Sequence, residues 1–199
     1  RAYGDANPAV DTNNFTYTSF VNGDTNSAVT ASADYLGTTV LSNVGSYGVN
    51  GSFTSANYNV TNTPSTTLTI NKRDITASVN DQSRAYGDAN PALTWADVVW
   101  NNLANSQDGS VLDALTLSSP TAVATSAAGT THAITLTGFS DNNYNLTGYT
   151  QGTLTINKRD ITASVNNQSR VYGDANPSLS WADVVWTNLA NAQDGSVLD

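Results

Sequence analysis

The chain has 199 residues, and its 16 acidic residues, all of them Asp, outnumber seven Lys and Arg, so the net charge is −9. This acidity argues against nucleic acid as a partner and against a polybasic contact with anionic lipid, because both need a basic surface. The absence of Cys excludes disulfides, thiolate-bound zinc and thiol nucleophiles. No apolar run approaches the roughly 20 residues of a membrane span, so we expect no direct membrane insertion.

Short runs of alternating apolar and polar residues predict strands, because successive side chains of a strand point to opposite faces. In chain order these runs are NFTYTSF at 14–20, SYGVNGSF at 46–53, TLTI at 67–70, ITASV at 75–79, AITLTGF at 133–139 and YNL at 144–146. TLTI and ITASV return at 153–156 and 161–165. We therefore expect five or six strands per repeat unit.

Turn residues separate these runs. Asn22-Gly23, Asn50-Gly51 and Asp108-Gly109 predict tight turns, since Gly, Asn and Asp tolerate the backbone angles that such turns require. TWADVVWNNLA at 94–104 fits either a strand through Val98 and Trp100 or a helix, and we favour the strand because NFTYTSF alternates at the corresponding place. A short helical turn is expected around residues 110–114.

The chain is a tandem array. Residues 67–113 return as residues 153–199 with six differences over 47 positions, and the string RAYGDANP at 1–8 recurs at 84–91 and, as RVYGDANP, at 170–177. A fixed period of this length indicates stacked structural repeats. We expect a first repeat at 1–72 that lacks its initial strand, a complete second repeat at 73–158, and the N-terminal half of a third at 159–199.

RAYGDANP, followed by SNVGSYGVNGSFTSANYNV and TLTINKRDITASV, resembles the MBG repeats of large bacterial surface and biofilm adhesins. The resemblance implies an all-β or mainly β chain of small β-grasp-like modules arranged end to end, with at most a short helix per module. It also implies an extracellular or cell-surface location, often in two-partner-secreted haemagglutinin-like exoproteins, and no catalytic centre. The motif residues are Tyr3, Gly4, Asp5 and Pro8, with their copies Tyr86, Gly87, Asp88, Pro91, Tyr172, Gly173, Asp174 and Pro177.

The YGDANP motif itself predicts a turn. Gly87 and its copies are expected in a backbone conformation that a Cβ would strain, with no apolar packing role, while Asp88 and Asn90 cap backbone amides. The alternative is Ca²⁺ on Asp88 and Asn90, with Asp108 of DGSVLD as a further weak candidate. So few ligands do not make a site, and we expect no metal and no cofactor.

Trp95 and Trp100, which recur as Trp181 and Trp186, are the candidate ligand-binding residues. Exposed Trp rings stack on sugars, whereas buried rings fill a core, and their odd spacing on a strand places one of each pair on either side. His132 is the only His, and no nucleophile or orienting carboxylate is marked for it. We therefore expect an exposed strand residue there and no enzyme.

The NKRD segments at 71–74 and 157–160 join the repeats without Gly or Pro. We expect Arg73 and Arg159 to pair with Asp of the adjacent repeat and to restrict the angle between repeats. The expected function is a structural stalk in an adhesin or matrix fibre, and the alternative is an exopolysaccharide-binding module that uses Trp and Asp surfaces. The expected partners are neighbouring repeats and a second copy that associates head to tail.

Overall fold

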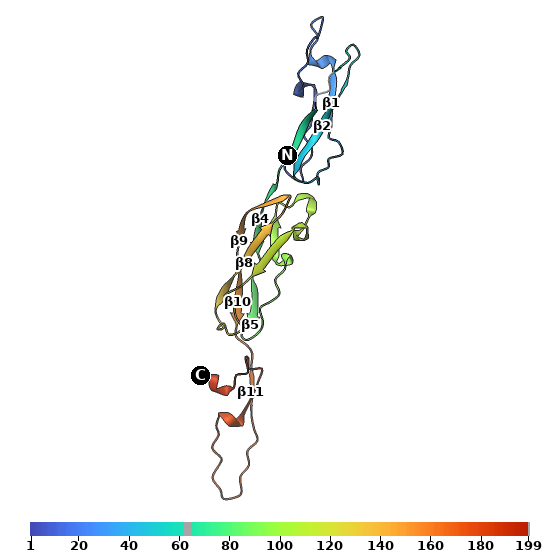
Figure 1. The fold of residues 1–199 in the computed structure, drawn as a ribbon. Helices are drawn as coiled ribbons and strands as arrows, with labels where there is room; N and C mark the ends of the chain where they lie inside the picture. Colours follow the sequence, from blue (N-terminus) through green and yellow to red (C-terminus); the bar gives the residue numbers. More distant parts are fainter. Residues whose placement is uncertain (62–64, 199) are drawn as a thin grey trace. The chain divides into compact units, whose positions relative to one another are not determined.

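The computed structural model describes residues 1–61 and 65–198 as β-strands joined by loops and three-residue 3-10 turns (Figure 1). The described residues contain no α-helix, and the expected mainly β fold is confirmed. The chain forms two compact units. One contains residues 1–77, 100–115 and 138–148, and the other contains residues 78–99, 116–137 and 149–199.

The first repeat contains one antiparallel sheet of order β1-β2-β3. Its strands are β1 (Thr30–Asp34), β2 (Gly45–Thr54) and β3 (Ser65–Ile70), and β1 and β2 lie side by side in Figure 1. The expected turn at Asn50-Gly51 is wrong, since both residues lie inside β2. A Cβ on Gly51 would lie 2.8 Å from the Phe53 ring, so an aromatic ring covers the strand where Gly has no side chain.

The loops of the first repeat hold two 3-10 turns, η1 (Thr12–Asn14) and η2 (Asn26–Ala28). The expected strand at 14–20 is wrong, because among the described residues no neighbouring strand pairs with this segment. The expected turn at Asn22-Gly23 is confirmed, with φ of 58° and 79°.

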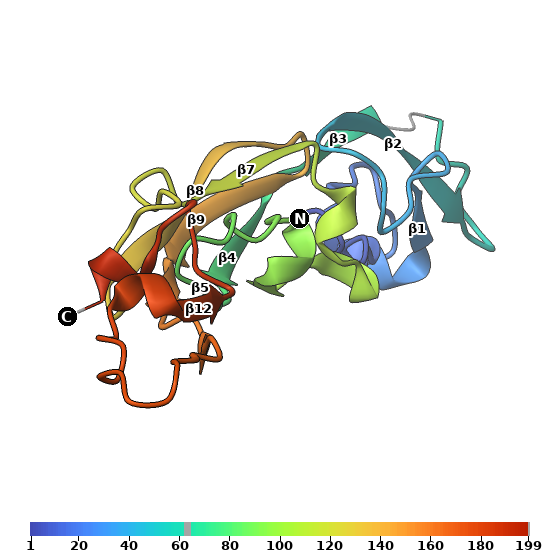
Figure 2. The same cartoon turned by 90° about the horizontal axis from the view of Figure 1, so that it is seen from below.

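The second repeat contains seven strands, more than the five or six expected. They are β4 (Arg73–Val79), β5 (Gln82–Ala85), β6 (Val98–Asn101), β7 (Ala114–Ser118), β8 (Thr131–Ser140), β9 (Tyr144–Thr150) and β10 (Gly152–Asn157). One sheet has the order β5-β10-β8-β7 and the other has the order β6-β4-β9. β5 is parallel to β10, whereas β8 is antiparallel to it. Figure 2 shows β7 and β8 side by side.

Alternation in the sequence accounts for the central strand β4. Ile75, Ala77 and Val79 are 1%, 7% and 4% exposed, and the residues between them face solvent. The strand preferred for 94–104 is confirmed as β6, after a single 3-10 turn η3 (Trp95–Asp97). Two further turns follow, η4 (Ala104–Ser106) and η5 (Gly109–Val111), and η5 corresponds to the expected short helical turn.

The third repeat contains two paired antiparallel strands, β11 (Thr162–Val165) and β12 (Val184–Thr187). Two 3-10 turns, η6 (Trp181–Asp183) and η7 (Gly195–Val197), flank β12. All four residues of β11 are exposed, in contrast to the buried alternate positions of β4.

Candidate repeat-junction site

The Tyr-Gly-Asp turn has the same backbone conformation in its three copies. Gly4, Gly87 and Gly173 have φ of +86°, +85° and +93°. This is the left-handed region that glycine adopts without strain and that a Cβ disfavours. The expected glycine conformation is therefore confirmed.

The Arg and Asn of the motif hold a facing loop. Arg84 Nε donates to Asn90 Oδ1 at 2.8 Å, and Asn90 Nδ2 donates to the Ala122 carbonyl at 2.9 Å. In the first copy of the motif, Arg1 Nε likewise donates to Asn7 Oδ1 at 2.8 Å. Arg84 is only 7% exposed, and its Nη1 and Nη2 also donate to the carbonyls of Ala85 and Val123, so its buried guanidinium has hydrogen-bond partners.

The Arg of NKRD then contacts the motif of the preceding repeat. Arg73 Nη1 lies 2.7 Å from Asp5 Oδ1 and donates to the Tyr3 carbonyl at 3.0 Å, while Arg73 Nε donates to the Asn102 carbonyl at 2.9 Å. The hydrogen bond from Arg73 lowers the pKa of Asp5 below its ordinary value. The guanidinium thus joins the motif of one repeat to a turn of the next.

The second junction repeats these contacts. Arg159 forms an ion pair with Asp88, and its Nε donates to the Tyr86 carbonyl at 2.8 Å. Arg159 Nη1 also donates to Asn188 Oδ1 at 2.8 Å. The expected pairing of each NKRD Arg with an Asp of the adjacent repeat is confirmed at both junctions.

Two motif glycines, Gly4 and Gly87, are partly buried, and each lies against an alanine. A Cβ built on Gly4 would overlap Ala104 Cβ, and one built on Gly87 would overlap Ala190 Cβ. Ala104 and Ala190 are 2% and 5% exposed. The expectation that these glycines have no packing role is wrong, because their missing side chain admits the turn of the next repeat.

A hydrophobic core spans the first junction. Its buried residues are Tyr3, Val49, Leu68 and Ile70 from the first repeat and Ile75, Ala104 and Tyr144 from the second. The rings of Tyr3 and Tyr144 meet edge to face with centroids 5.3 Å apart. The Tyr144 hydroxyl accepts from the Ala104 N–H at 3.0 Å and donates to Gln107 Oε1. Burial raises the pKa of this hydroxyl.

The second junction has a matching amide contact and a cavity. Gln193 Nε2 donates to the Tyr86 hydroxyl at 3.1 Å, as Gln107 Nε2 does to Tyr3 at 3.3 Å. A cavity of about 600 Å³ is lined by residues that include Tyr86, Ala190 and Gln193. These are the counterparts of the residues that Tyr144 contacts in the first junction.

The third copy of the motif is open. Tyr172 is fully exposed, and no described atom lies within 4 Å of a Cβ built on Gly173. Asp174 and Pro177 are exposed as well. Pro8 and Pro91 lie outside the strands and precede the 3-10 turns η1 and η3.

One Trp of each pair lies at the surface. Trp95 and Trp181 are 45% and 59% exposed, whereas Trp100 and Trp186 are partly buried. The ring centroids of Trp100 and Phe139 lie 6.2 Å apart. The Nε1 atoms of Trp100 and Trp186 are buried without a partner among the described residues. The ring centroids of Trp181 and Trp186 lie 6.0 Å apart, and Trp95 and Trp181 present exposed rings at equivalent positions of their repeats.

The weak metal candidates bind protein groups. Asp88 pairs with Arg159, Asn90 holds the facing loop, and Asp108 Oδ1 accepts the Ser110 N–H at 2.9 Å. Across residues 1–61 and 65–198, no three His, Cys, Asp or Glu residues gather as a metal site. 

His132 is half-buried, so the expectation of an exposed residue is wrong. Its Nδ1 and Nε2 lie 3.0 Å and 3.3 Å from the hydroxyls of Thr121 and Thr130.

Sequence reasoning missed the partner turn at 102–107. Its signal is the string NLANSQ, which returns as NLANAQ at 188–193. Asn102, Asn105 and Ser106 all have positive φ, which shapes the turn that carries Ala104.

Residues 1–69 and 75–155 match the family model described as MBG domain (YGX type). No curated protein matches the chain, and no solved structure does. No described helix has the length and apolar character needed to cross a membrane.

Proposed function

Because the chain belongs to the MBG domain (YGX type) family, a repeat domain of bacterial surface proteins, we propose that it is a structural stalk of a secreted or cell-surface adhesin. The stalk projects an adhesive region or builds extracellular matrix fibres. MBG repeats are typically non-catalytic, and we propose no reaction for this chain. At each of the two junctions, the NKRD Arg of one repeat binds the Asp in the motif of the preceding repeat.

The core that spans the first junction carries this proposal. Repeats that tumble independently on a linker each need a complete core of their own. Here Tyr3 of the first repeat and Tyr144 of the second pack in one cluster and are 5% and 2% exposed. Bending at this junction would expose both rings to water, so the shared core resists it.

The recurrence of the polar contacts supports the same conclusion. Arg73 and Arg159 bind equivalent groups in consecutive junctions, at positions 86 residues apart. When the same contact recurs at each boundary, successive repeats are joined in the same way, as expected of an array that serves as a spacer. The net charge of −9 keeps neighbouring stalks apart in solution.

Small-angle scattering of the chain tests the coupling. We expect a maximum dimension well above that of a compact globule of 20.8 kDa. Ala104→Leu and Ala190→Leu overpack the two glycine contacts and should make the scattering profile that of a more flexible particle. Val21→Leu is the matched control, because Val21 is the counterpart of Ala104 in the first repeat and is 58% exposed. A compact wild-type profile would contradict the proposal.

The exposed Trp95 and Trp181 favour a second candidate function, binding of exopolysaccharide by ring stacking. The acidic chain would disfavour acidic polymers, so the expected ligand is a neutral or basic polysaccharide. A glycan array with the purified chain tests this function, and Trp95→Ala with Trp181→Ala should remove the signal. Val99→Ala is a suitable control, since Val99 is 60% exposed nearby. An array without signal would argue against it.

A further inference from the structure

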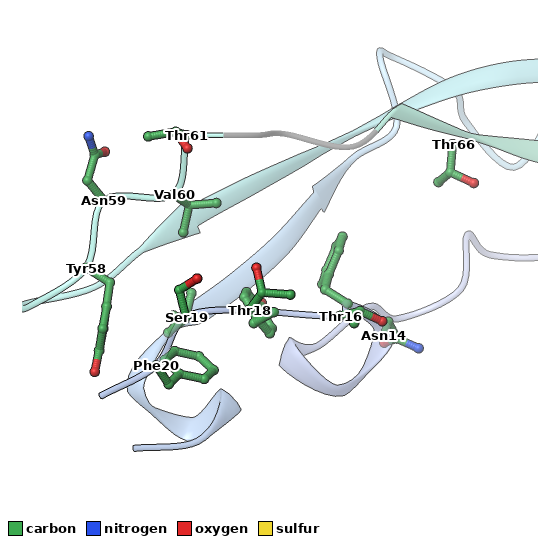
Figure 3. Close-up of a pocket in the computed structure, with 13 residues that line it drawn as sticks. Asn14, Thr16, Thr18, Ser19, Phe20, Tyr58, Asn59, Val60, Thr61 and Thr66 are labelled. Carbon is green, nitrogen blue, oxygen red and sulfur yellow. The ribbon is translucent and has the colours of Figure 1, made fainter. Parts of the chain in front are cut away.

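Two hollows in the chain differ in their lining. The larger lies in the first repeat, has a volume of about 730 Å³ and is lined mainly by hydroxyl and amide side chains, among them Thr16, Thr18 and Asn59 in Figure 3. The smaller lies in the second repeat, has a volume of about 270 Å³ and is called the second-repeat pocket below. Its lining is mainly apolar and includes Pro91, Leu93, Leu117, Pro120, Ile134 and Leu154.

The floor of the second-repeat pocket belongs to the sheet core. Ile134 on β8 and Leu154 on β10 are 0% and 1% exposed. Leu68 is the counterpart of Leu154 in the repeated string TLTI. Val49 pairs with the residue two positions before Leu68, as Ile134 pairs with the residue two positions before Leu154, so Val49 corresponds to Ile134.

The loop beside the pocket follows the same path in both repeats. The motif Asn donates from Nδ2 to the Thr38 carbonyl at 3.3 Å in the first repeat and to the Ala122 carbonyl at 2.9 Å in the second. The N–H groups of Thr38 and Ala122 donate in turn to the carbonyls of Tyr35 and Ser119, at 3.0 Å and 3.2 Å. Ser119 therefore stands where the first repeat has Tyr35.

The Tyr35 side chain fills this place in the first repeat. Its hydroxyl donates to the Pro8 carbonyl, and its half-buried ring packs against the core that contains Val49 and Leu68. In the second repeat the much shorter Ser119 lines the pocket, together with Pro91, the counterpart of Pro8. The pocket thus corresponds to the space that the Tyr35 ring occupies in the first repeat.

The pocket has a polar group at each end. Ser119 is 7% exposed, and its Oγ is buried with no hydrogen-bond partner among the described residues. A buried hydroxyl normally has a partner, because leaving one unpaired is costly. Ser119 Oγ lies where the Tyr35 side chain begins, and the Pro91 carbonyl is the counterpart of the acceptor where the Tyr35 side chain ends.

We propose that the second-repeat pocket binds a small phenol that carries a polar group para to its hydroxyl. The ring lies over Ile134 and Leu154, its hydroxyl donates to the Pro91 carbonyl, and the para group bonds with Ser119 Oγ. An apolar cavity of about 150 Å³ is sufficient for benzene. A volume of about 270 Å³ therefore suits one ring with two small substituents.

The loop favours a free small molecule over a side chain of a partner protein. Its backbone keeps the path that carries Tyr35 in the first repeat, so a second polypeptide backbone has no room to take that place. The pocket reaches solvent beside Pro120, which is exposed. The residues that line it are uncharged, so a neutral compound is the expected ligand.

Calorimetric titration of the 199-residue chain with para-hydroxybenzyl alcohol tests the proposal. We expect saturable binding at one site per chain. Ser119→Tyr supplies the ring of the first repeat and should abolish binding. Thr125→Tyr places the same side chain at an exposed position of the same loop and should leave binding unchanged. A wild-type chain that does not bind, or Ser119→Tyr that binds as the wild type does, overturns the proposal.

Two related probes test the chemistry of the ligand. para-Cresol lacks the second polar group and should bind the wild-type chain about tenfold more weakly, whereas both compounds should bind Ser119→Ala equally. N-Acetyltyrosinamide carries its phenol on a peptide backbone and should also bind at least tenfold more weakly. The same preference in Ser119→Ala and the wild type overturns the role of Ser119, and tighter binding of N-acetyltyrosinamide overturns the assignment to a small molecule.

Methyl NMR spectra of the same samples locate the site. para-Hydroxybenzyl alcohol should shift the methyl signals of Ile134 and Leu154 in the wild-type chain. Tyr35→Ser opens the equivalent space in the first repeat, so it should raise the number of sites from one to two and add shifts at Val49 and Leu68. Shifts confined to other residues overturn the location, and a folded Tyr35→Ser chain with one site overturns the equivalence of the two positions.

Discussion

Gly87 lies directly against Ala190, so that a Cβ on Gly87 would lie 3.3 Å from the Ala190 Cα and overlap its Cβ. Gly4 and Ala104 have the same relationship in the preceding junction. Glycine is therefore required at this position for two reasons. Its backbone has positive φ, and the absence of a Cβ leaves room for the turn of the next repeat.

Gly87→Ala should destabilise the chain by about 2–4 kcal/mol, because it adds backbone strain and overpacks a close contact. Gly173→Ala separates the two effects. It has φ of +93° with no described atom near the added Cβ, so it should cost only about 1 kcal/mol. Chemical denaturation of both variants measures the difference. Equal losses would show that Ala190 contributes nothing.

The ion pair of Arg73 and Asp5 predicts a pH dependence. The hydrogen bond from Arg73 lowers the pKa of folded Asp5 below its ordinary value of 3.8. Its contribution to folding is therefore present above this value and is lost as the pH falls through the lower folded-state pKa. Because the Asp5 side chain is 48% exposed, we expect less than about 1 kcal/mol.

Urea denaturation from about pH 6 to about pH 2.5 measures this effect. The wild-type chain should lose more stability on acidification than Asp5→Asn. The difference should vanish in an Arg73→Ala background, which removes the partner. A difference that persists without Arg73 would assign the pH dependence to another cause.

Sequence alternation predicted the strands whose two faces have different surroundings. β4 is the clearest case, because Ile75, Ala77 and Val79 are buried while the residues between them are exposed. The same logic failed at 14–20, although Phe15 and Tyr17 alternate. A strand exists only with a neighbour, and the side-chain pattern of one segment does not report whether that neighbour is present.

Local turn chemistry was reliable where no packing opposed it. Asn22-Gly23 turns as predicted, whereas Asn50-Gly51 is held straight inside β2 by its neighbours and covered by Phe53. The Arg73 pairing was predictable from charge, since basic residues are few. The Gly4 contact with Ala104 was not, because it joins residues 100 positions apart and neither has a chemically distinctive side chain.

Tyr144→Phe should destabilise the chain by about 1–3 kcal/mol, because it leaves the N–H of buried Ala104 without its acceptor. Tyr58→Phe is a matched control. Its hydroxyl makes the equivalent bonds to Val21 and Asp24, but Val21 is 58% exposed, so water replaces the lost acceptor at little cost. Denaturant titration of both variants measures the two losses.

A large loss of stability in Tyr144→Phe with a small loss in Tyr58→Phe would show that the hydrogen bonds of Tyr144 stabilise the chain because they are buried in the junction. Tyr144 is 2% exposed within the core that spans the junction, and its ring is retained in the variant, so the apolar contact with Tyr3 is unchanged. Equal losses would contradict this account, because both hydroxyls would then contribute as local turn contacts that are independent of the adjacent repeat.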